Sequence, residues 1–310
     1  MTNQQPLDLL LIGGSGFVSG TLARLALARG HRVWAVTRGE RPLPAGVHAI
    51  TADRRDRRAF AAAIGRANQR WQLVVDCIGY EPDDARQDCE VFRACAEHLV
   101  FISTDFVYDP ARRRFPQPEE SAHYLSEGYG GQKRAAERVF AEGNSAAPAW
   151  TIVRPGHIYG PGSLLGCLPL HGRDPALLAR LQRGEPIALV GGGYFLQQPI
   201  LAADLAATIL SCYGNQRSHG QIYNTAGPEI VESHFYYQII ADLLGVPLQV
   251  AEIPVSQFLR EQPDRRSFIC HRIYDLGKLH EDGLSVPATP LSTGLRQHVT
   301  SLMEQANDAH

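Results

Sequence analysis

The sequence lacks the cysteine patterns of a metalloprotein or of a disulfide-stabilised secreted protein. Its six cysteines form no CxxC pair and no cysteine–histidine cluster of zinc-like spacing. We therefore expect free thiols in a reducing compartment and no metal site. The cysteines stand at positions 77, 89, 95, 167, 212 and 270.

Long apolar runs and a strong charge of either sign are also missing. The longest apolar stretches are too short to span a bilayer, and the polar segment 1–8 does not have the form of a signal peptide. The net charge is −2, and the basic runs at residues 54–58 and 112–114 are short. We expect a cytoplasmic protein with no membrane or nucleic-acid partner, whose 310 residues form one or two domains.

What the sequence does contain is a glycine-rich turn between a buried strand and an amphipathic helix. Residues 7–12 form a near-continuous apolar run, as a strand covered on both faces requires. The run leads into Gly13-Gly14-Ser15-Gly16-Phe17-Val18, and the helix that follows ends at Gly30, before a second strand over 32–36. Glycines here allow close approach to a pyrophosphate, which the positive end of the helix would hold. We interpret this βαβ unit as a dinucleotide site; a plain glycine-rich turn is the alternative.

The end of the second strand bears on the choice of cofactor. Folds that bind NAD usually place an acid here to hold the ribose 2′-hydroxyl. This chain instead has Arg38, and no acid precedes Glu40. An arginine can make a bidentate contact with a 2′-phosphate. The sequence therefore favours NADP over NAD, with a surface arginine beside a turn as the alternative.

Three further predicted strands alternate with helices along the first half of the chain. They cover residues 49–53, 73–79 and 99–104, and helical stretches lie around 56–68 and 83–97. This alternation predicts an α/β fold with a doubly wound parallel sheet, which binds ligands at the carboxyl ends of its strands. Asp53 would meet an adenine amino group there. The candidates that fall at these ends are Asp53, Cys77, Ile78, Gly79 and Thr104.

Tyr129 and Lys133 are four residues apart and would share one face of a helix. The lysine cation favours the phenolate, so that the tyrosine could exchange a proton at physiological pH. By itself the pattern is common, and a boundary tyrosine beside a solvated lysine is the simpler interpretation. Its position downstream of a nucleotide-binding turn and a strand-end hydroxyl reverses that preference and indicates an enzyme.

With these residues the chain resembles the extended and atypical short-chain dehydrogenase/reductases, the nucleotide-sugar epimerase/dehydratase superfamily. The resemblance extends over most of the chain, and the motifs occur in the family's order. They are the opening turn at 13–17, the hydroxyl-bearing strand at 101–108, the YxxxK pair, the RPxxxYGPG-like segment at 153–162 and a return to the core at 198–206. Residues 37–39 are closest to an atypical branch that includes chloroplast stem-loop RNA-binding proteins.

The resemblance implies a particular division of the chain. A dinucleotide-binding Rossmann domain would cover residues 1–153, with 198–227 returning to it. A smaller substrate-binding lobe would be built from 154–197 and 228–310. A homodimer is usual in the family, so it is a possible assembly here.

The resemblance also implies roles for individual residues. Hydride would pass to or from a carbon that bears a hydroxyl or carbonyl, with Tyr129 as acid/base. Lys133 would stabilise the phenolate and hold the nicotinamide ribose, and Thr104 would bind the substrate oxygen. Further cofactor contacts would come from Pro155 and His157, and substrate contacts from Asp105, His157 and Gln197.

Departures from the family pattern narrow the reaction and leave the substrate open. Phe106 stands where the dehydratases carry a glutamate, which argues against dehydration. His157 replaces a common asparagine, and Gln197-Gln198-Pro199 replaces an Arg-Asp-Phe segment whose arginine commonly contacts a substrate diphosphate. We predict an NADP-dependent oxidoreductase or epimerase that acts on a small polar metabolite such as a sugar. The alternatives are ketone reduction without epimerisation, and a non-catalytic NADP-binding sensor or RNA-associated protein.

Overall fold

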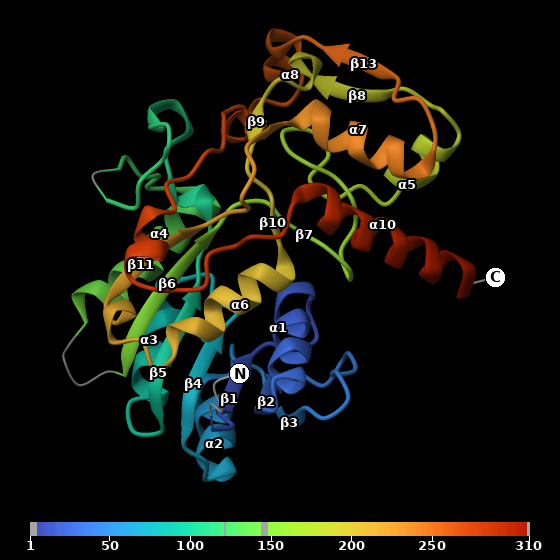
Figure 1. Cartoon of the computed structure of the whole chain (residues 1–310). Helices are drawn as coiled ribbons and strands as arrows, with labels where there is room; N and C mark the ends of the chain where they lie inside the picture. The colour runs from blue at the N-terminus through green and yellow to red at the C-terminus, as the bar shows by residue number, and fades with distance from the viewer. Residues whose placement is uncertain (1–4, 121, 144–147, 309–310) are drawn as a thin grey trace.

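The computed structural model describes residues 5–120, 122–143 and 148–308, so the first four residues of the polar segment 1–8 lie outside it. Its largest element is a seven-stranded parallel sheet of order β11-β6-β5-β4-β1-β2-β3 (Figure 1). The strands are β1 Asp8–Ile12, β2 Arg32–Thr37, β3 His48–Thr51, β4 Trp71–Asp76, β5 Ala96–Ile102, β6 Ala149–Pro155 and β11 Gln221–Thr225.

Helices cover both faces of this sheet. On one face, α1 (Phe17–Ala28) and α6 (Ala202–Cys212) enclose an aliphatic core with strand residues such as Leu9 and Leu11. On the other, α2 (Arg57–Ala67), α3 (Pro82–Val91) and α4 (Gly128–Glu142) enclose a core that includes Leu10. Strands buried on both faces need near-continuous apolar sequence, which is the pattern seen here. The predicted doubly wound α/β fold is confirmed.

The chain leaves the large sheet after β6 and comes back to it through β10 (Ile200–Leu201), α6 and β11. β11 pairs in parallel with β6 at the sheet edge, and α6 lies beside α1. Residues 198–227 thus lie with the first half of the chain. The exact domain boundaries inferred from the resemblance stay predictions.

A second group of elements lies above the carboxyl ends of the strands in Figure 1. It has its own apolar core, formed mainly by α5, α7, β8 and α10. Its elements are β7 Ile158–Tyr159, α5 Leu177–Gln182, β8 Ile187–Val190, β9 Leu196–Gln197, β12 Val231–Glu232, α7 Ser233–Leu244, β13 Val250–Ile253, α8 Val255–Glu261 and α10 Leu291–Asp308. The short helix α9 Gly277–Glu281 packs instead on the large sheet beside β11.

Two local predictions need correction. The polar residues 303–310 look like a frayed tail in the sequence, but α10 continues to Asp308; residues 309–310 lie outside the described part. The buried residues Leu291, Leu295 and Val299 anchor this helix at helical spacing, and its polar end continues from them. The helix predicted over 83–97 ends at Val91, because the chain must turn before β5 begins at Ala96.

Candidate active site

The glycine turn between β1 and α1 has a backbone that only glycine adopts easily. Gly13 and Gly14 have φ angles of 103° and 145°. A Cβ on Gly14 would stand 2.6 Å from the Cβ of Ala35. The Ser19 hydroxyl accepts hydrogen bonds from the amides of Gly14 and Gly16 at 3.0 and 3.1 Å. The first turn of α1 contains no acid, so its positive end is not neutralised.

This turn forms one wall of a cavity of about 1140 Å³. The cavity continues along the carboxyl ends of β1, β2, β3 and β4, where a doubly wound sheet binds its ligand. Its glycine cradle and open helix terminus suit a dinucleotide diphosphate. The predicted cofactor residues in its lining are Gly13, Gly14, Ser15, Gly16, Phe17, Val18, Arg38, Asp53, Cys77 and Ile78.

The end of the cavity beside β2 and β3 is rich in arginine. Arg38 lines it and pairs with Glu40 at 2.7 Å, with both side chains mostly exposed. Arg41 and Arg55 line it as well, and no ion pair of either is found in the described part of the chain. Asp53 accepts a hydrogen bond from the Arg55 amide at 2.9 Å. Arg55 was missed in the sequence because short basic runs are typical of solvated surface, and Arg41 because it belongs to no motif.

A wall from the second half of the chain closes the opposite side of the cavity. It includes residues 162–164, Arg173, Leu302 and Gln305. The Arg173 Nε donates to the Ser163 hydroxyl at 3.0 Å, and its guanidinium lies 5.7 Å from the centre of the Phe17 ring. No motif in the sequence indicated this wall, because the contacts join segments far apart in the chain.

The predicted pair of Tyr129 and Lys133 lies on α4, which approaches the end of β5 very closely. A Cβ on Gly130 would stand 2.0 Å from the carbonyl oxygen of Phe106. Glycine at this position therefore lets the first turn of α4 pack directly on the segment that follows Thr104. The Tyr129 ring lies between Phe106 and Tyr80, with both ring centres 6.2 Å away.

The ionisation of Tyr129 differs from the expectation. Desolvation of the hydroxyl and the nearby Tyr80 phenol raise its pKa, while a hydrogen bond with Thr104 and the charge of Arg173 act in the opposite direction. The expected lowering of this pKa by Lys133 is absent. Tyr129 is half exposed at the start of the helix, whereas Lys133, one turn later, points into the protein.

Lys133 is 3% exposed and holds the ends of two strands together. Its Nζ donates to the carbonyl oxygens of Gly79 and Ile102 at 2.6 and 2.7 Å. The rings of Phe101 and Tyr80 lie 4.7 and 5.0 Å from the ammonium. Burial lowers the pKa of Lys133 to about 8. Gly79, predicted to contact the cofactor, lies behind the cavity lining and holds this lysine instead.

Thr104 and Asp105 follow β5. The Thr104 Oγ1 accepts a hydrogen bond from the Phe106 amide at 3.3 Å. Asp105 is buried, and its carboxylate binds Arg272, Arg113 at 3.0 Å and the Tyr274 hydroxyl at 2.6 Å. Burial opposes its ionisation, but Arg272 and Arg113 outweigh this and hold its pKa below the usual value. Asp105 therefore acts as a structural acceptor in this structure.

The remaining candidates are Pro155, His157 and Gln197. Like Thr104, Asp105, Tyr129 and Lys133, they lie outside the cavity lining. Pro155 ends β6. Burial lowers the pKa of His157 to about 4, and its ring packs edge-on against Tyr236 with the ring centres 6.3 Å apart. Gln197 is fully buried, and neither polar atom of its amide has a hydrogen-bond partner among the described residues.

Metal-binding clusters and membrane-spanning helices are absent from the described residues. No three His, Cys, Asp or Glu side chains gather there in a way that could hold a metal ion. Among the helices described, none is both long and apolar enough to cross a membrane.

Comparison with known proteins places this site in a family. A model described as the NAD dependent epimerase/dehydratase family matches residues 9–226. The 2′-dehydrokanamycin reductase of Streptomyces kanamyceticus is 28% identical over 290 residues, which covers 89% of this chain and 79% of that protein. The chloroplast stem-loop binding protein of 41 kDa b from Arabidopsis thaliana is 24% identical over 244 residues, which covers 72% of this chain and 59% of that protein.

A solved structure shows the same fold. The UDP-glucose 4-epimerase of Thermus thermophilus, in complex with NAD, superimposes with a TM-score of 0.74 at 19% identity. The superposition covers 96% of this chain and 99% of that one. The resemblance predicted from the motifs is confirmed: the chain belongs to the NAD dependent epimerase/dehydratase family, a family of NAD(P)-dependent enzymes.

Proposed function

We propose that this protein is an NADP-dependent reductase or epimerase that moves a hydride to or from a carbon bearing a hydroxyl or carbonyl of a small, sugar-like metabolite. One observation carries the proposal. The tight packing of α4 at Gly130 brings Tyr129 to Thr104, while Lys133 holds the Gly79 carbonyl of the loop whose residues Cys77 and Ile78 line the dinucleotide cavity.

Different residues of the cavity lining would hold the different parts of the cofactor. The turn at 13–18 would hold the diphosphate, and Arg38 with Arg41 would hold a 2′-phosphate on the adenosine ribose. Cys77 and Ile78 would lie beside the dinucleotide. When bound, the nicotinamide supplies or accepts the hydride.

Tyr129 would move the proton that accompanies this transfer. Its hydroxyl would donate to a carbonyl oxygen during reduction, or accept from an alcohol during oxidation. Thr104 would orient the same substrate oxygen. A phenol with a raised pKa keeps its proton at neutral pH, which suits the donor role and hence the reductive direction. Lys133 would contribute indirectly, by holding in place the Gly79 carbonyl of the loop beside the cofactor.

The residues at two positions where the family carries charged groups support a substrate class. The fully buried Gln197 stands in the segment where relatives often carry a diphosphate-binding arginine, and an amide suits a neutral hydroxyl or amine better than a diphosphate. The similarity to a reductase named for 2′-dehydrokanamycin supports a sugar-like substrate. Phe106, against the Tyr129 ring, supplies no second acid for dehydration.

A panel of keto sugars and keto aminoglycosides tests the proposal by following NADPH absorbance. We expect Tyr129→Phe to lower turnover by roughly 10²–10⁴-fold, the range for general acid/base groups. Tyr213→Phe is the matched control, because it removes a phenol hydroxyl whose one hydrogen bond among the described residues is to surface Glu97. Wild-type turnover in Tyr129→Phe would exclude the acid/base role. Net consumption of NADPH indicates reduction, whereas an isomerised substrate with unchanged cofactor indicates epimerisation.

A further inference from the structure

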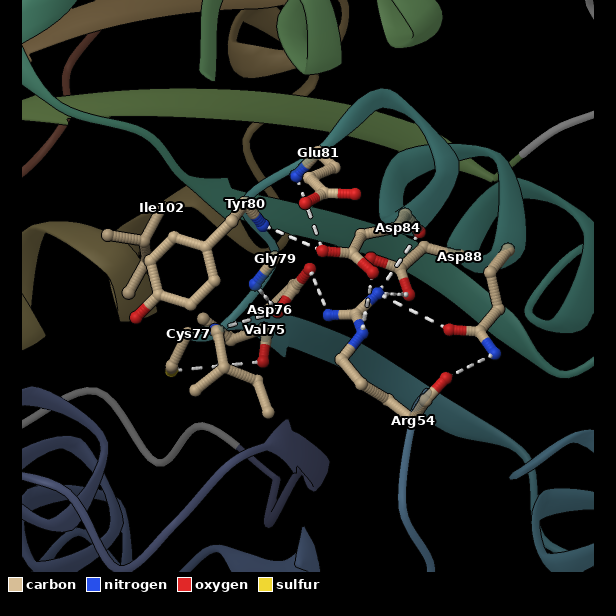
Figure 2. Close-up of polar contacts among 12 residues, drawn as sticks. Arg54, Val75, Asp76, Cys77, Gly79, Tyr80, Glu81, Asp84, Asp88 and Ile102 are labelled. Carbon is tan, nitrogen blue, oxygen red and sulfur yellow. Dashed lines mark hydrogen bonds and ion pairs between the residues drawn. The ribbon is translucent and has the colours of Figure 1, made fainter. Parts of the chain in front are cut away.

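A largely buried arginine lies in the wall of the dinucleotide cavity, surrounded by three carboxyl groups (Figure 2). Arg54 is 8% exposed. Its nitrogens lie 2.8 Å from Asp76, 3.4 Å from Asp84 and 3.1 Å from Asp88. The guanidinium therefore joins the turn after β3, the end of β4 and the helix α3.

Two of these carboxylates also bind the loop that follows β4. Asp76 accepts hydrogen bonds from the amides of Ile78 and Gly79 at 2.9 and 2.8 Å. Asp84 accepts from the amides of Tyr80 and Glu81 at 2.8 and 3.3 Å. In both carboxylates one oxygen faces Arg54 and the other faces the loop, as Figure 2 shows. The place of residues 77–81 thus depends on Arg54.

This loop in turn holds Lys133. The Gly79 carbonyl accepts from its Nζ at 2.6 Å, and the Tyr80 ring covers the ammonium. The loop has little freedom to shift, because a Cβ on Gly79 would stand 2.1 Å from the Asp76 carboxylate. A continuous set of contacts therefore runs from Arg54 through Asp76 and Gly79 to Lys133.

The charges explain why the loop needs a guanidinium. Burial and the nearby Asp76 raise the pKa of Asp88 well above its usual value. Burial opposes the ionisation of Asp76, but Arg54 outweighs this and lowers its pKa. Without Arg54, Asp76 and Asp84 would face each other uncompensated. A buried charge that loses its partner is strongly destabilised.

We propose that Arg54 is a positioning residue that fixes the loop 77–81 through Asp76 and Asp84, and thereby sets the place of the Lys133 ammonium. Its planar fork is what reaches several carboxylates at once, so a lysine at this position would not replace it. The catalytic consequence rests on the role proposed above for Lys133. The positioning itself can be measured without any turnover.

The sequence offers a clean probe, because Lys133 and Lys278 are its only two lysines. Protein labelled with ¹³C at the lysine ε-carbon gives two signals. Lys278 pairs with Glu120 at the surface and is the internal reference. In the wild type we expect the Lys133 signal to titrate with a midpoint near pH 8. Asp76, Glu137 and Arg54 are the charges that act on this lysine besides its burial.

In Arg54→Gln we expect the Lys133 signal to move and its midpoint to rise towards ~10.4, the value of an exposed lysine. Loss of a nearby positive charge would by itself raise this midpoint. Arg54→Lys separates the two causes, since it keeps the charge and loses the fork. The lysine introduced at position 54 adds a third signal, which is identified in the double variant Arg54→Lys/Lys133→Arg. The proposal requires the Lys133 signal to be displaced in Arg54→Lys as well; a wild-type signal there would overturn it.

Two further variants complete the test. Arg58→Gln removes an exposed arginine on α2 and should leave both lysine signals unchanged. Asp84→Asn is the milder variant in case Arg54→Gln does not fold, because Asp84 is partly exposed and binds the Tyr80 and Glu81 amides. It should shift the Lys133 signal in the same direction by a smaller amount. An unchanged Lys133 signal in Asp84→Asn would contradict the proposal. A lack of turnover with every substrate of the keto-sugar panel would contradict the proposed function but not the positioning by Arg54.

Discussion

At the scale of single residues, the proposed preference for NADP over NAD rests on the arginines at the end of the cavity beside β2 and β3. Arg38 and Arg41 both line it. The ion pair between Arg38 and Glu40 is exposed, and such pairs contribute little free energy, so Glu40 is easily displaced by a phosphate. Glu40 would repel a 2′-phosphate only if its carboxylate stayed paired with Arg38.

Arg38→Ala should weaken NADPH binding roughly tenfold to a hundredfold, because hydrogen bonds to charged groups contribute about 1.5–3 kcal/mol. NADH binding should change little, because NADH has no 2′-phosphate. Titration calorimetry with both cofactors measures this. Arg66→Ala, an exposed arginine at the far end of α2, is the control. Equal losses for the two cofactors would rule out a 2′-phosphate contact.

The chemistry-bearing residues were predictable to different degrees. The glycine turn, Arg38, Asp53 and the end of β4 could be placed from the sequence, because strand ends of a parallel sheet meet at one edge. The direct effect of Lys133 on Tyr129 could not. Helical spacing gives a shared face, but it does not tell how deeply each side chain lies. Arg54, part of a basic run that looks solvated, could not be recognised as buried.

At the scale of elements, the contact between α4 and the segment after β5 determines where Tyr129 lies. We expect Gly130→Ala to destabilise the fold by about 1–3 kcal/mol, as overpacking does, because the new methyl group would meet the Phe106 carbonyl. Chemical denaturation measures the change. Gly65→Ala is the matched control, since a Cβ there meets nothing within 4 Å, and it should stabilise α2 by roughly 0.5–1 kcal/mol.

If Gly130→Ala is as stable as the wild type, the close approach of α4 is not required. The type of each helix or strand could be predicted from the sequence more readily than its length. The buried strands and α2 agree with the apolar pattern within a few residues. The length of α10 does not agree with the apolar pattern, because its last turns are polar. Their helical form depends on the anchored turns before them.

At the scale of the whole molecule, buried histidines link stability to acid pH. His98 on β5 is 2% exposed, and its Nε2 lies 2.8 Å from the Thr151 hydroxyl. That hydroxyl donates to the Ser218 carbonyl, so the His98 Nε2 must be the donor in their contact. Burial, assisted by His219, lowers the pKa of His98 to about 3.

As the pH falls, a histidine whose pKa is lowered by folding is protonated in the unfolded chain before it is protonated in the folded protein. The unfolded state therefore gains protons as the pH falls below about 6.5, and the free energy of unfolding should decrease by up to roughly 1.4 kcal/mol per pH unit until the folded pKa near 3 is reached. Urea denaturation between pH 7 and 4 should show a smaller slope in His98→Gln. An identical slope in the variant would mean that His98 is not responsible.

The fold class and the family were predictable at this scale, because the alternation of strands and helices leaves few topologies. The cytoplasmic location and the homodimer stay predictions. The wall of the cavity from residues 162–164, 173 and 302–305 was not predictable, because it depends on how two separately packed cores meet. No local pattern in the sequence carries that information.

The cavity wall has a consequence for how the protein is made. Leu302 and Gln305, near the end of the chain, face the same cavity as the turn at residues 13–18 near its start. During synthesis, the glycine turn leaves the ribosome almost a whole chain length before α10. A nascent chain can thus complete its large sheet while its dinucleotide cavity is still open on one side.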